Sequence, residues 1–221
     1  MTGVLVNQAP LRVDHVSYAA ERDGLRATAA RLAARIGVDV VDGGVHPRFG
    51  TRNVILPLAG HRYVEVVEVL DHPASDKAPF GQAVRIRSEN GGGWLGWVVA
   101  VPDIGPVERR LGRQAVVGSR RRPDGSELRW LQLGVNGLIS DPQLPFYVRW
   151  DDGTPHPSLD ARTSVKISGL EIAGERQRVR DWLGLRPEVQ PVEVSFSYVA
   201  PHGNPGLLSV TFATPDGPVT V

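Results

Sequence analysis

A repeated order of sequence patterns restricts the fold of this chain more than any other feature. The first copy has one strand-like run, one helical pattern and three more strand-like runs, at residues 11–20, 24–37, 38–45, 53–58 and 63–70. The same order begins again with the strand-like run LGWVVAVPD at residues 95–103. One such unit leaves an apolar sheet face that a partner unit must cover. The sequence therefore predicts an α+β protein made of repeated βαβββ modules.

The repeat also predicts how the chain is divided. The expected segments are an N-terminal arm, a first βαβββ module, a connector, a second βαβββ module and a C-terminal partial module, at residues 1–10, 11–73, 74–93, 94–163 and 164–221. Within them, helices are predicted at 24–37, 103–112 and 175–184, the first and last ending at Gly37 and Gly184.

Charge and composition exclude several classes of function. The 25 basic and 24 acidic side chains give a net charge of +1, so no field favours nucleic acid or an anionic membrane. The chain has no cysteine, which excludes disulfides, thiolate catalysis and iron–sulfur clusters. Any metal would have to bind histidine and carboxylate side chains.

No targeting pattern marks the sequence. The first ten residues lack the basic start and apolar run of a signal peptide, and no apolar stretch approaches the roughly 20 residues that span a bilayer. We therefore expect a cytoplasmic protein without membrane contacts.

Several strings along the chain have a common resemblance. DHVSYAA, GGVHPRFGTRN and YVEVVEVLDHP lie within residues 12–73, and WLGWVVAVPD, LPFYVRWDD and TPHPS follow later. Together they resemble the glyoxalase-like domain of the vicinal-oxygen-chelate superfamily, which includes glyoxalases, bleomycin-resistance proteins and extradiol dioxygenases. The resemblance implies that two modules curl their mixed sheets around a cup that binds a small organic molecule.

The resemblance also places metal-ligand positions on the first and last strands of each module. His15 and Glu65 match these positions in the first module. The second module departs from the pattern, because no histidine stands near Gly96 and Trp97 and the counterpart of Glu65 is approximately Arg149. A divalent ion normally needs three protein ligands. We therefore expect no cofactor, with a divalent metal on His15 and Glu65 as the lesser alternative.

Two functions follow from the resemblance. In the first, the protein is a lyase or isomerase in which Glu65 is the general base and His15 is a polar or metal ligand. In the second, it binds or sequesters a small molecule without chemistry, as bleomycin-resistance proteins do. A single histidine in an apolar strand is often structural, and a register slip of one residue would exchange Glu65 for Glu68.

The GGVHPRFGTRN string supplies further candidates for ligand binding. His46, Arg48 and Asn53 are its polar side chains, while the glycines shape its backbone. The alternative is a surface turn with solvated charges.

The second module supplies the other candidates. Arg149 is expected to face the cup and bind an anionic group, or to pair with Glu65 when the cup is empty. Trp150, with Phe146 and Tyr147, forms either an aromatic wall of the cup or part of the core. The basic triplet at 120–122 is expected in a solvated hairpin turn. A homodimer joined through sheet edges stays open as an alternative assembly.

Overall fold

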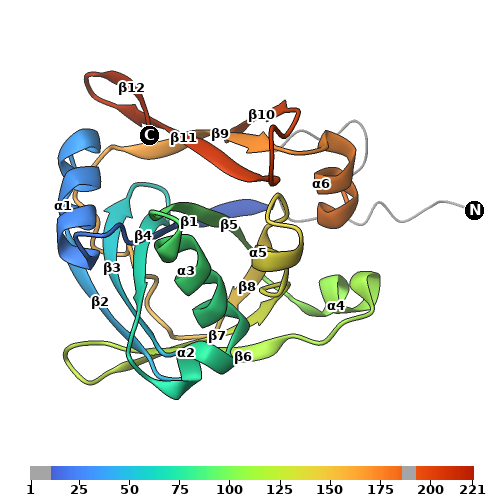
Figure 1. The fold of residues 1–221 in the computed structure, drawn as a ribbon, viewed down its shortest axis with the longest axis horizontal. Coiled ribbons are helices and arrows are strands. Elements are labelled where there is room, and N and C mark those ends of the chain that lie inside the picture. The colour runs from blue at the N-terminus through green and yellow to red at the C-terminus, as the bar shows by residue number, and fades with distance from the viewer. Residues whose placement is uncertain (1–10, 186–192) are drawn as a thin grey trace, which may run out of the picture.

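Eight strands close into a barrel in the order β1-β4-β3-β2-β6-β7-β8-β5 (Figure 1). The computed structural model describes residues 11–185 and 193–221, so the predicted arm at 1–10 lies outside the described residues. The barrel strands are β1 Arg12–Ala19, β2 Val41–His46, β3 Thr51–Leu58, β4 Arg62–Val69, β5 Gly93–Ala100, β6 Val116–Arg121, β7 Glu127–Leu133 and β8 Phe146–Trp150.

The two halves of the barrel have the same strand pairing. In the first half β1 lies parallel to β4, and in the second half β5 lies parallel to β8. The halves are joined where β1 runs antiparallel to β5 and where β2 meets β6 at Val45 and Arg121. This arrangement confirms the predicted α+β fold of βαβββ modules curled around a cup.

Helix α1, Leu25–Ile36, covers the outer face of the first half (Figure 1). Its buried positions recur at helical spacing, and Gly37 ends it in a left-handed conformation with its N–H bonded to the carbonyl of Ala33. Helix α4, Gly105–Leu111, occupies the corresponding place in the second half, and α5 is a single turn at Gly137–Ser140.

Two helices occupy the segment that the sequence suggested to be a connector. They are α2, Pro73–Lys77, and α3, Pro79–Glu89. Phe80, Ala83 and Val84 of α3 pack with inner side chains of the barrel, including Val67 and Val98. Their spacing is helical, but the prolines and glycines around them obscured the pattern. Helix α3 thus supplies one wall of the barrel interior.

A second sheet, β10-β9-β11-β12, packs on the outside of the barrel near β5 (Figure 1). Its strands and the helix within this block are β9 Lys166–Ala173, α6 Arg176–Leu183, β10 Ser195–Val199, β11 Gly206–Thr214 and β12 Gly217–Thr220. The block repeats the order of elements, but β10 pairs directly with β9, which no barrel half does. Trp94 of β5 donates to the carbonyl of Val221 at 2.9 Å and joins the two layers.

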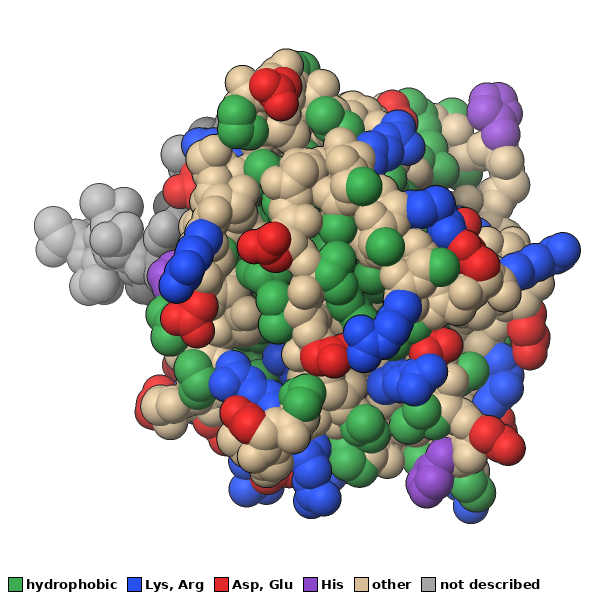
Figure 2. Space-filling model, turned by 90° about the vertical axis from the view of Figure 1, so that its left-hand side faces the viewer, with side chains coloured by type: hydrophobic (Ala, Val, Ile, Leu, Met, Phe, Trp, Pro, Cys, Tyr) green, Lys and Arg blue, Asp and Glu red, His purple; other side chains and the backbone are tan. Residues whose placement is uncertain are grey.

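Charged side chains of both signs mix on the face toward the left of Figure 1, as Figure 2 shows. Ion pairs at this part of the surface join Arg26 to Asp42 and Arg31 to Glu21. Among the described residues, no helix is both long enough and apolar enough to cross a bilayer.

Candidate active site in the barrel

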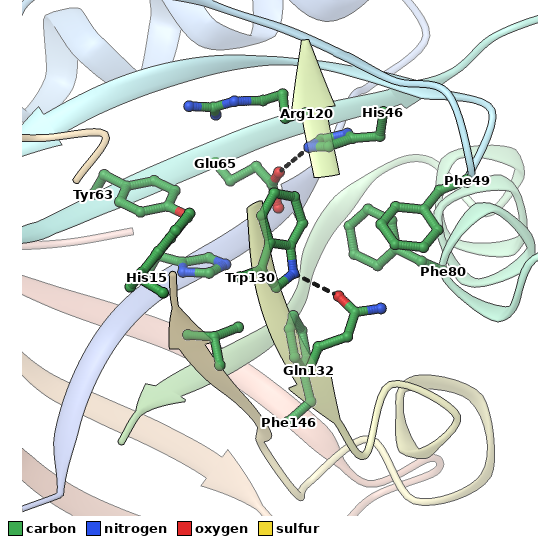
Figure 3. A pocket seen from close by; sticks show the side chains of 12 residues that line it. His15, His46, Phe49, Tyr63, Glu65, Phe80, Arg120, Trp130, Gln132 and Phe146 are labelled. Atoms are coloured by element: carbon green, nitrogen blue, oxygen red, sulfur yellow. Dashed lines mark hydrogen bonds and ion pairs between the residues drawn. The ribbon is translucent and has the colours of Figure 1, made fainter. Parts of the chain in front are cut away.

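A narrow cavity lies inside the barrel, between the two halves and helix α3 (Figure 3). The space between its walls, including the open mouth, measures about 420 Å³. The first half contributes His15, His46, Tyr63 and Glu65 to the lining. The cavity therefore suits a small ligand or the reactive end of a larger one.

Glu65 is the carboxylate of this cavity and is only 5% exposed. Strand pairing places it beside Ser17 of β1, whose hydroxyl donates to Oε2 at 2.9 Å. Asn53 of β3 donates through Nδ2 to Oε1 at 2.7 Å. Nε2 of His46 lies 3.7 Å from the same Oε1 (Figure 3). Both carboxylate oxygens are thus held by side chains from neighbouring strands.

These surroundings set the charge states of Glu65 and His46. Burial alone raises the pKa of Glu65, but the His46 and His15 rings and the hydrogen bonds from Asn53 and Ser17 outweigh it and lower that pKa. Burial lowers the pKa of His46 to about 4. At neutral pH the cavity therefore holds a carboxylate next to a neutral imidazole.

Two glycines explain why Asn53 can reach Glu65. A Cβ on Gly43 would lie 2.0 Å from Oδ1 of Asn53, so only glycine leaves room for that amide. Gly44 has φ 122°, and a Cβ there would lie 2.0 Å from the carbonyl oxygen of Arg121. Gly43 thus leaves room for the amide of Asn53, and Gly44 allows the close approach of β6 that closes the barrel.

His15 is held by its own neighbour in the chain. A bulge in the pairing of β1 with β5 falls between Val13 and His15, and Nδ1 of His15 lies 2.8 Å from Oδ1 of Asp14. The His15 ring also stacks on Tyr63, with centroids 4.4 Å apart. Since Asp14 occupies Nδ1, Nε2 is the ring nitrogen that remains for a ligand.

Asp14 is fully buried and collects further partners from the second half. Nε1 of Trp150 donates to Oδ2 at 3.3 Å, and Nε2 of His156 lies 3.2 Å from the same atom. Burial alone raises the pKa of Asp14, but its hydrogen bonds with His15 and His156 outweigh it and hold that pKa well below its usual value. Asp14 is therefore an ionised anchor that fixes His15 from behind.

The second half lines the cavity mainly with apolar and aromatic groups. Phe146, Val148 and Trp150 of β8 face it, together with Trp130 and Gln132 of β7. Nε1 of Trp130 donates to Oε1 of Gln132 at 2.8 Å (Figure 3). The remaining polar group from this half is Arg120 of β6, which is 4% exposed.

The structure brings together most of the candidates named from the sequence. His15, His46, Glu65 and Trp150 line the cavity, and Asn53 contacts Glu65 from β3. The competing carboxylate of Glu68 is elsewhere, because it pairs with Arg52 near the surface. Arg48 is exposed and donates to the carbonyl of Val117 at 3.2 Å.

Arg149 does not face the cup, contrary to expectation. Its side chain is 27% exposed and pairs with Asp151 and Asp152. Alternation along β8 turns its neighbours Val148 and Trp150 inward instead. The inferred register of β8 was wrong by one residue, so the counterpart of Glu65 is an apolar side chain.

Sequence reasoning missed three groups at this site. Asp14 was not among the candidates, because simple alternation along a strand places it on the opposite face from His15 and does not anticipate the bulge at this point. Arg120 was placed in a solvated turn, but β6 extends to Arg121 and carries it inside. Ser17 was not among the candidates either. Only the cross-strand register reveals that it meets Glu65.

The donor set does not fit a divalent metal. Both oxygens of Glu65 accept hydrogen bonds, and Asp14 occupies one nitrogen of His15. Within residues 11–185 and 193–221, no three His, Cys, Asp or Glu side chains are placed to hold an ion. The second half adds the cation of Arg120 to the cavity, which repels another cation.

Comparison with known proteins places this site in a family. A family model described as a glyoxalase-like domain matches residues 13–185, which is more than half of the chain. The chain belongs to the glyoxalase-like family. The resemblance read from the first module is thereby confirmed, and the glyoxalase-like segment contains both barrel halves and the whole cavity.

Several solved structures are similar to this glyoxalase-like protein, and the first of them supports the fold. A hypothetical protein from Staphylococcus aureus has a TM-score of 0.68 at 13% identity, covering 91% of this chain and 90% of that one. Methylmalonyl-CoA epimerase from Mycobacterium tuberculosis has a TM-score of 0.41 at 16% identity, covering 68% and 91%. A methylmalonyl-CoA epimerase in complex with methylmalonyl-CoA and NH4+ has 0.43 at 18%, covering 67% and 100%. We base no argument on the two structures with scores below 0.5. No curated protein sequence matches the chain.

Proposed function

We propose that this glyoxalase-like protein binds a small organic molecule in the barrel cavity and moves a proton on it, as a lyase or isomerase. Glu65 is the general base that removes a proton from carbon. His15 is the polar group that stabilises the oxyanion formed next to that carbon. The observation that carries the proposal is the ionised, buried carboxylate of Glu65 in one cavity with the ring of His15.

The geometry around Glu65 supports the role of base. Abstraction of a proton from carbon requires a carboxylate that is ionised and shielded from bulk water. The hydrogen bonds from Ser17 and Asn53 keep Glu65 ionised, and they also fix its direction. These bonds lower its basicity, so we expect a substrate whose carbon acid is already activated by an adjacent carbonyl group.

The contact with Asp14 supports the role of His15. An imidazole that donates Nδ1–H to a buried carboxylate keeps its tautomer and its ring plane. The other nitrogen, Nε2, then faces the ligand. In this state Nε2 accepts a hydrogen bond from a substrate hydroxyl, takes the proton of that hydroxyl and returns it to the oxygen that becomes negative as Glu65 removes the proton from carbon, so that His15 ends as it began.

A second candidate function is binding without chemistry. It is favoured by one specific observation: each oxygen of Glu65 already accepts a short hydrogen bond, from Asn53 at 2.7 Å and from Ser17 at 2.9 Å. A carboxylate held in this way can serve as a fixed polar wall for a ligand that packs on aromatic side chains.

Solvent exchange distinguishes the two functions. Wild-type protein in D2O is incubated with a panel of small 2-oxo and 2-hydroxy acids and their esters, and NMR follows deuterium at the carbon next to the carbonyl or hydroxyl group. We expect exchange in wild type and a loss of about 10²-fold or more in Glu65→Gln, which is typical of removing a general base. Glu68→Gln, on the same strand but paired with Arg52, serves as the matched control. A panel member that binds without exchanging favours the second function.

A further inference from the structure

Arg120 is a buried cation that forms no hydrogen bond or ion pair within the described part of the chain. Its residue is 4% exposed, and its Nε is a buried atom with no hydrogen-bond acceptor. No hydrogen bond or ion pair joins its guanidinium to any residue in 11–185 or 193–221. Buried charges in proteins are normally paired, because an unpaired one loses its hydration without compensation. The cavity in front of Arg120 is the place where a missing partner would lie.

The side chain of Arg120 lies at this cavity, inside the barrel. Its cross-strand neighbour on β7 is Leu128, which is buried inside the barrel. Figure 3 shows its side chain extending away from His46, toward the side on which Tyr63 lies. Arg120 and Tyr63 both line the cavity, and each acts electrostatically on the other. No hydrogen bond of the Tyr63 hydroxyl to another described residue occurs, so a second donor is available in the same cavity.

Glu65 is not the partner of Arg120. The charge of Glu65 attracts Arg120, but no ion pair joins the two groups, and both Glu65 oxygens are held by Ser17 and Asn53. Asp14, the other buried carboxylate nearby, is held by His15, His156, Trp150 and Arg12. Each internal anion at the site is thus already bound, and Arg120 alone stays available for an anion from outside.

We propose that Arg120, assisted by the hydroxyl of Tyr63, binds the carboxylate group of the small molecule that this cavity accepts. The proposal rests on the proposed function and adds the substrate class: a small carboxylic acid with a compact apolar body. A guanidinium matches a planar carboxylate through two parallel N–H bonds. The apolar body packs against Phe49, Phe80 and Phe146, which line the cavity.

The size of the cavity restricts that class further. Its space measures about 420 Å³ including the open mouth and is lined largely by aromatic side chains, which favours a planar carboxylate on a compact body. A tetrahedral phosphate, with four oxygens, fills more room and matches the guanidinium plane less well.

The test uses matched pairs of small ligands that differ in charge. Wild type, Arg120→Met and Arg120→Lys are titrated calorimetrically with benzoate and isobutyrate, with benzamide and isobutyramide as neutral partners, and with inorganic phosphate, at constant ionic strength in chloride. Arg149→Met is the control, since Arg149 is an arginine of the same half that pairs with Asp151 and Asp152 outside the cavity.

We expect at least one carboxylate to bind wild type about tenfold or more tightly than its amide, corresponding to about 1.4 kcal/mol. Arg120→Met removes this preference, Arg120→Lys retains part of it and Arg149→Met keeps it. Arg120→Met is also expected to melt no lower than wild type in chloride, because it removes an unpaired buried charge. That melting curve separates lost binding from lost folding.

The proposal is overturned if no carboxylate binds, if carboxylate binding survives in Arg120→Met, or if phosphate binds more tightly than every carboxylate. The same titrations in Glu65→Gln keep this result separate from the proposed reaction. Carboxylate binding that persists there without any deuterium exchange in wild type supports Arg120 and refutes catalysis. Deuterium exchange on a neutral ester without any carboxylate binding supports catalysis and refutes the proposed role of Arg120.

Discussion

Asp14 and His15 are consecutive residues of β1, yet their side chains contact each other, with Nδ1 of His15 2.8 Å from Oδ1 of Asp14. Successive side chains of a regular strand point to opposite faces and do not meet in this way. The bulge between Val13 and His15 breaks this alternation and brings the two side chains together. A local backbone irregularity thus creates the carboxylate–imidazole pair.

Asp14→Asn tests this pair. The amide keeps the shape of the side chain but presents only one acceptor oxygen, so it cannot satisfy His15, His156 and Trp150 as the carboxylate does. We expect the free energy of unfolding to fall by about 3 kcal/mol and the exchange reaction to slow. Urea unfolding and NMR exchange measure the two effects. Asp152→Asn, at a side chain 95% exposed, should change neither, and an unaffected Asp14→Asn would contradict the anchor role.

Acid should destabilise the protein through His46. Burial lowers its pKa to about 4 from 6.5, so the unfolded chain takes up a proton at a higher pH than the folded chain does. The free energy of unfolding therefore decreases as pH falls from 6.5 to about 4, by on the order of 2–3 kcal/mol for this group. Urea titrations across this window should show a shallower slope in His46→Gln.

His202→Gln provides the control for the pH experiment, because His202 lies in an exposed loop. Its variant should follow the wild-type slope. Identical slopes for wild type and His46→Gln would refute the neutral state of His46.

Ser17→Ala should change the pH dependence of the proposed reaction. The hydroxyl of Ser17 donates to the ionised form of Glu65, and removing a donor to the charged form raises the pKa of a carboxyl. The acid side of the rate profile is therefore expected to move to higher pH. The free energy of unfolding should fall by about 1–2 kcal/mol. A profile that stays in place would show that Glu65 is not the group that titrates in the reaction.

Gly43→Ala should disturb the site through Asn53. The added Cβ would lie 2.0 Å from Oδ1 of Asn53, so either the amide or the strand has to move, which typically costs about 1–3 kcal/mol. Deuterium exchange should fall together with the free energy of unfolding. Gly137→Ala meets nothing within 4 Å and lies in helix α5, so it should be neutral or slightly stabilising. Equal stability of the two variants would contradict the packing role of Gly43.

The sequence was sufficient to predict the modules because their signal is periodic. Buried positions of α1 at helical spacing and alternating runs such as the one at Tyr63, Glu65 and Val67 reflect which faces are covered. The repeated order then indicated that two sheets cover each other. Helix α3 was not predicted, because Pro79 and Gly81 interrupt its pattern. Its buried residues nevertheless have helical spacing, at Phe80, Ala83 and Val84.

The site was harder to predict because it depends on register. His15, Glu65 and His46 were identified from one half, where the strands are long and alternate clearly. Arg149 was predicted to face the cavity in place of its inward-facing neighbours on β8, a strand of only five residues. A slip of one position moves every side chain of a strand to the opposite face. Arg120 gave no signal of burial in the sequence, since arginine is rarely enclosed.

The cavity divides its side chains between two copies of one structural unit. The carboxylate of Glu65 and the two histidines of the cavity come from the first copy, and the aromatic wall of β7 and β8 comes from the second. A duplicated gene whose halves diverged in this way can acquire new ligand preferences by substitutions in the second half alone. Selection for the shape of the ligand and selection for the chemistry of the site then act on separate segments of the chain.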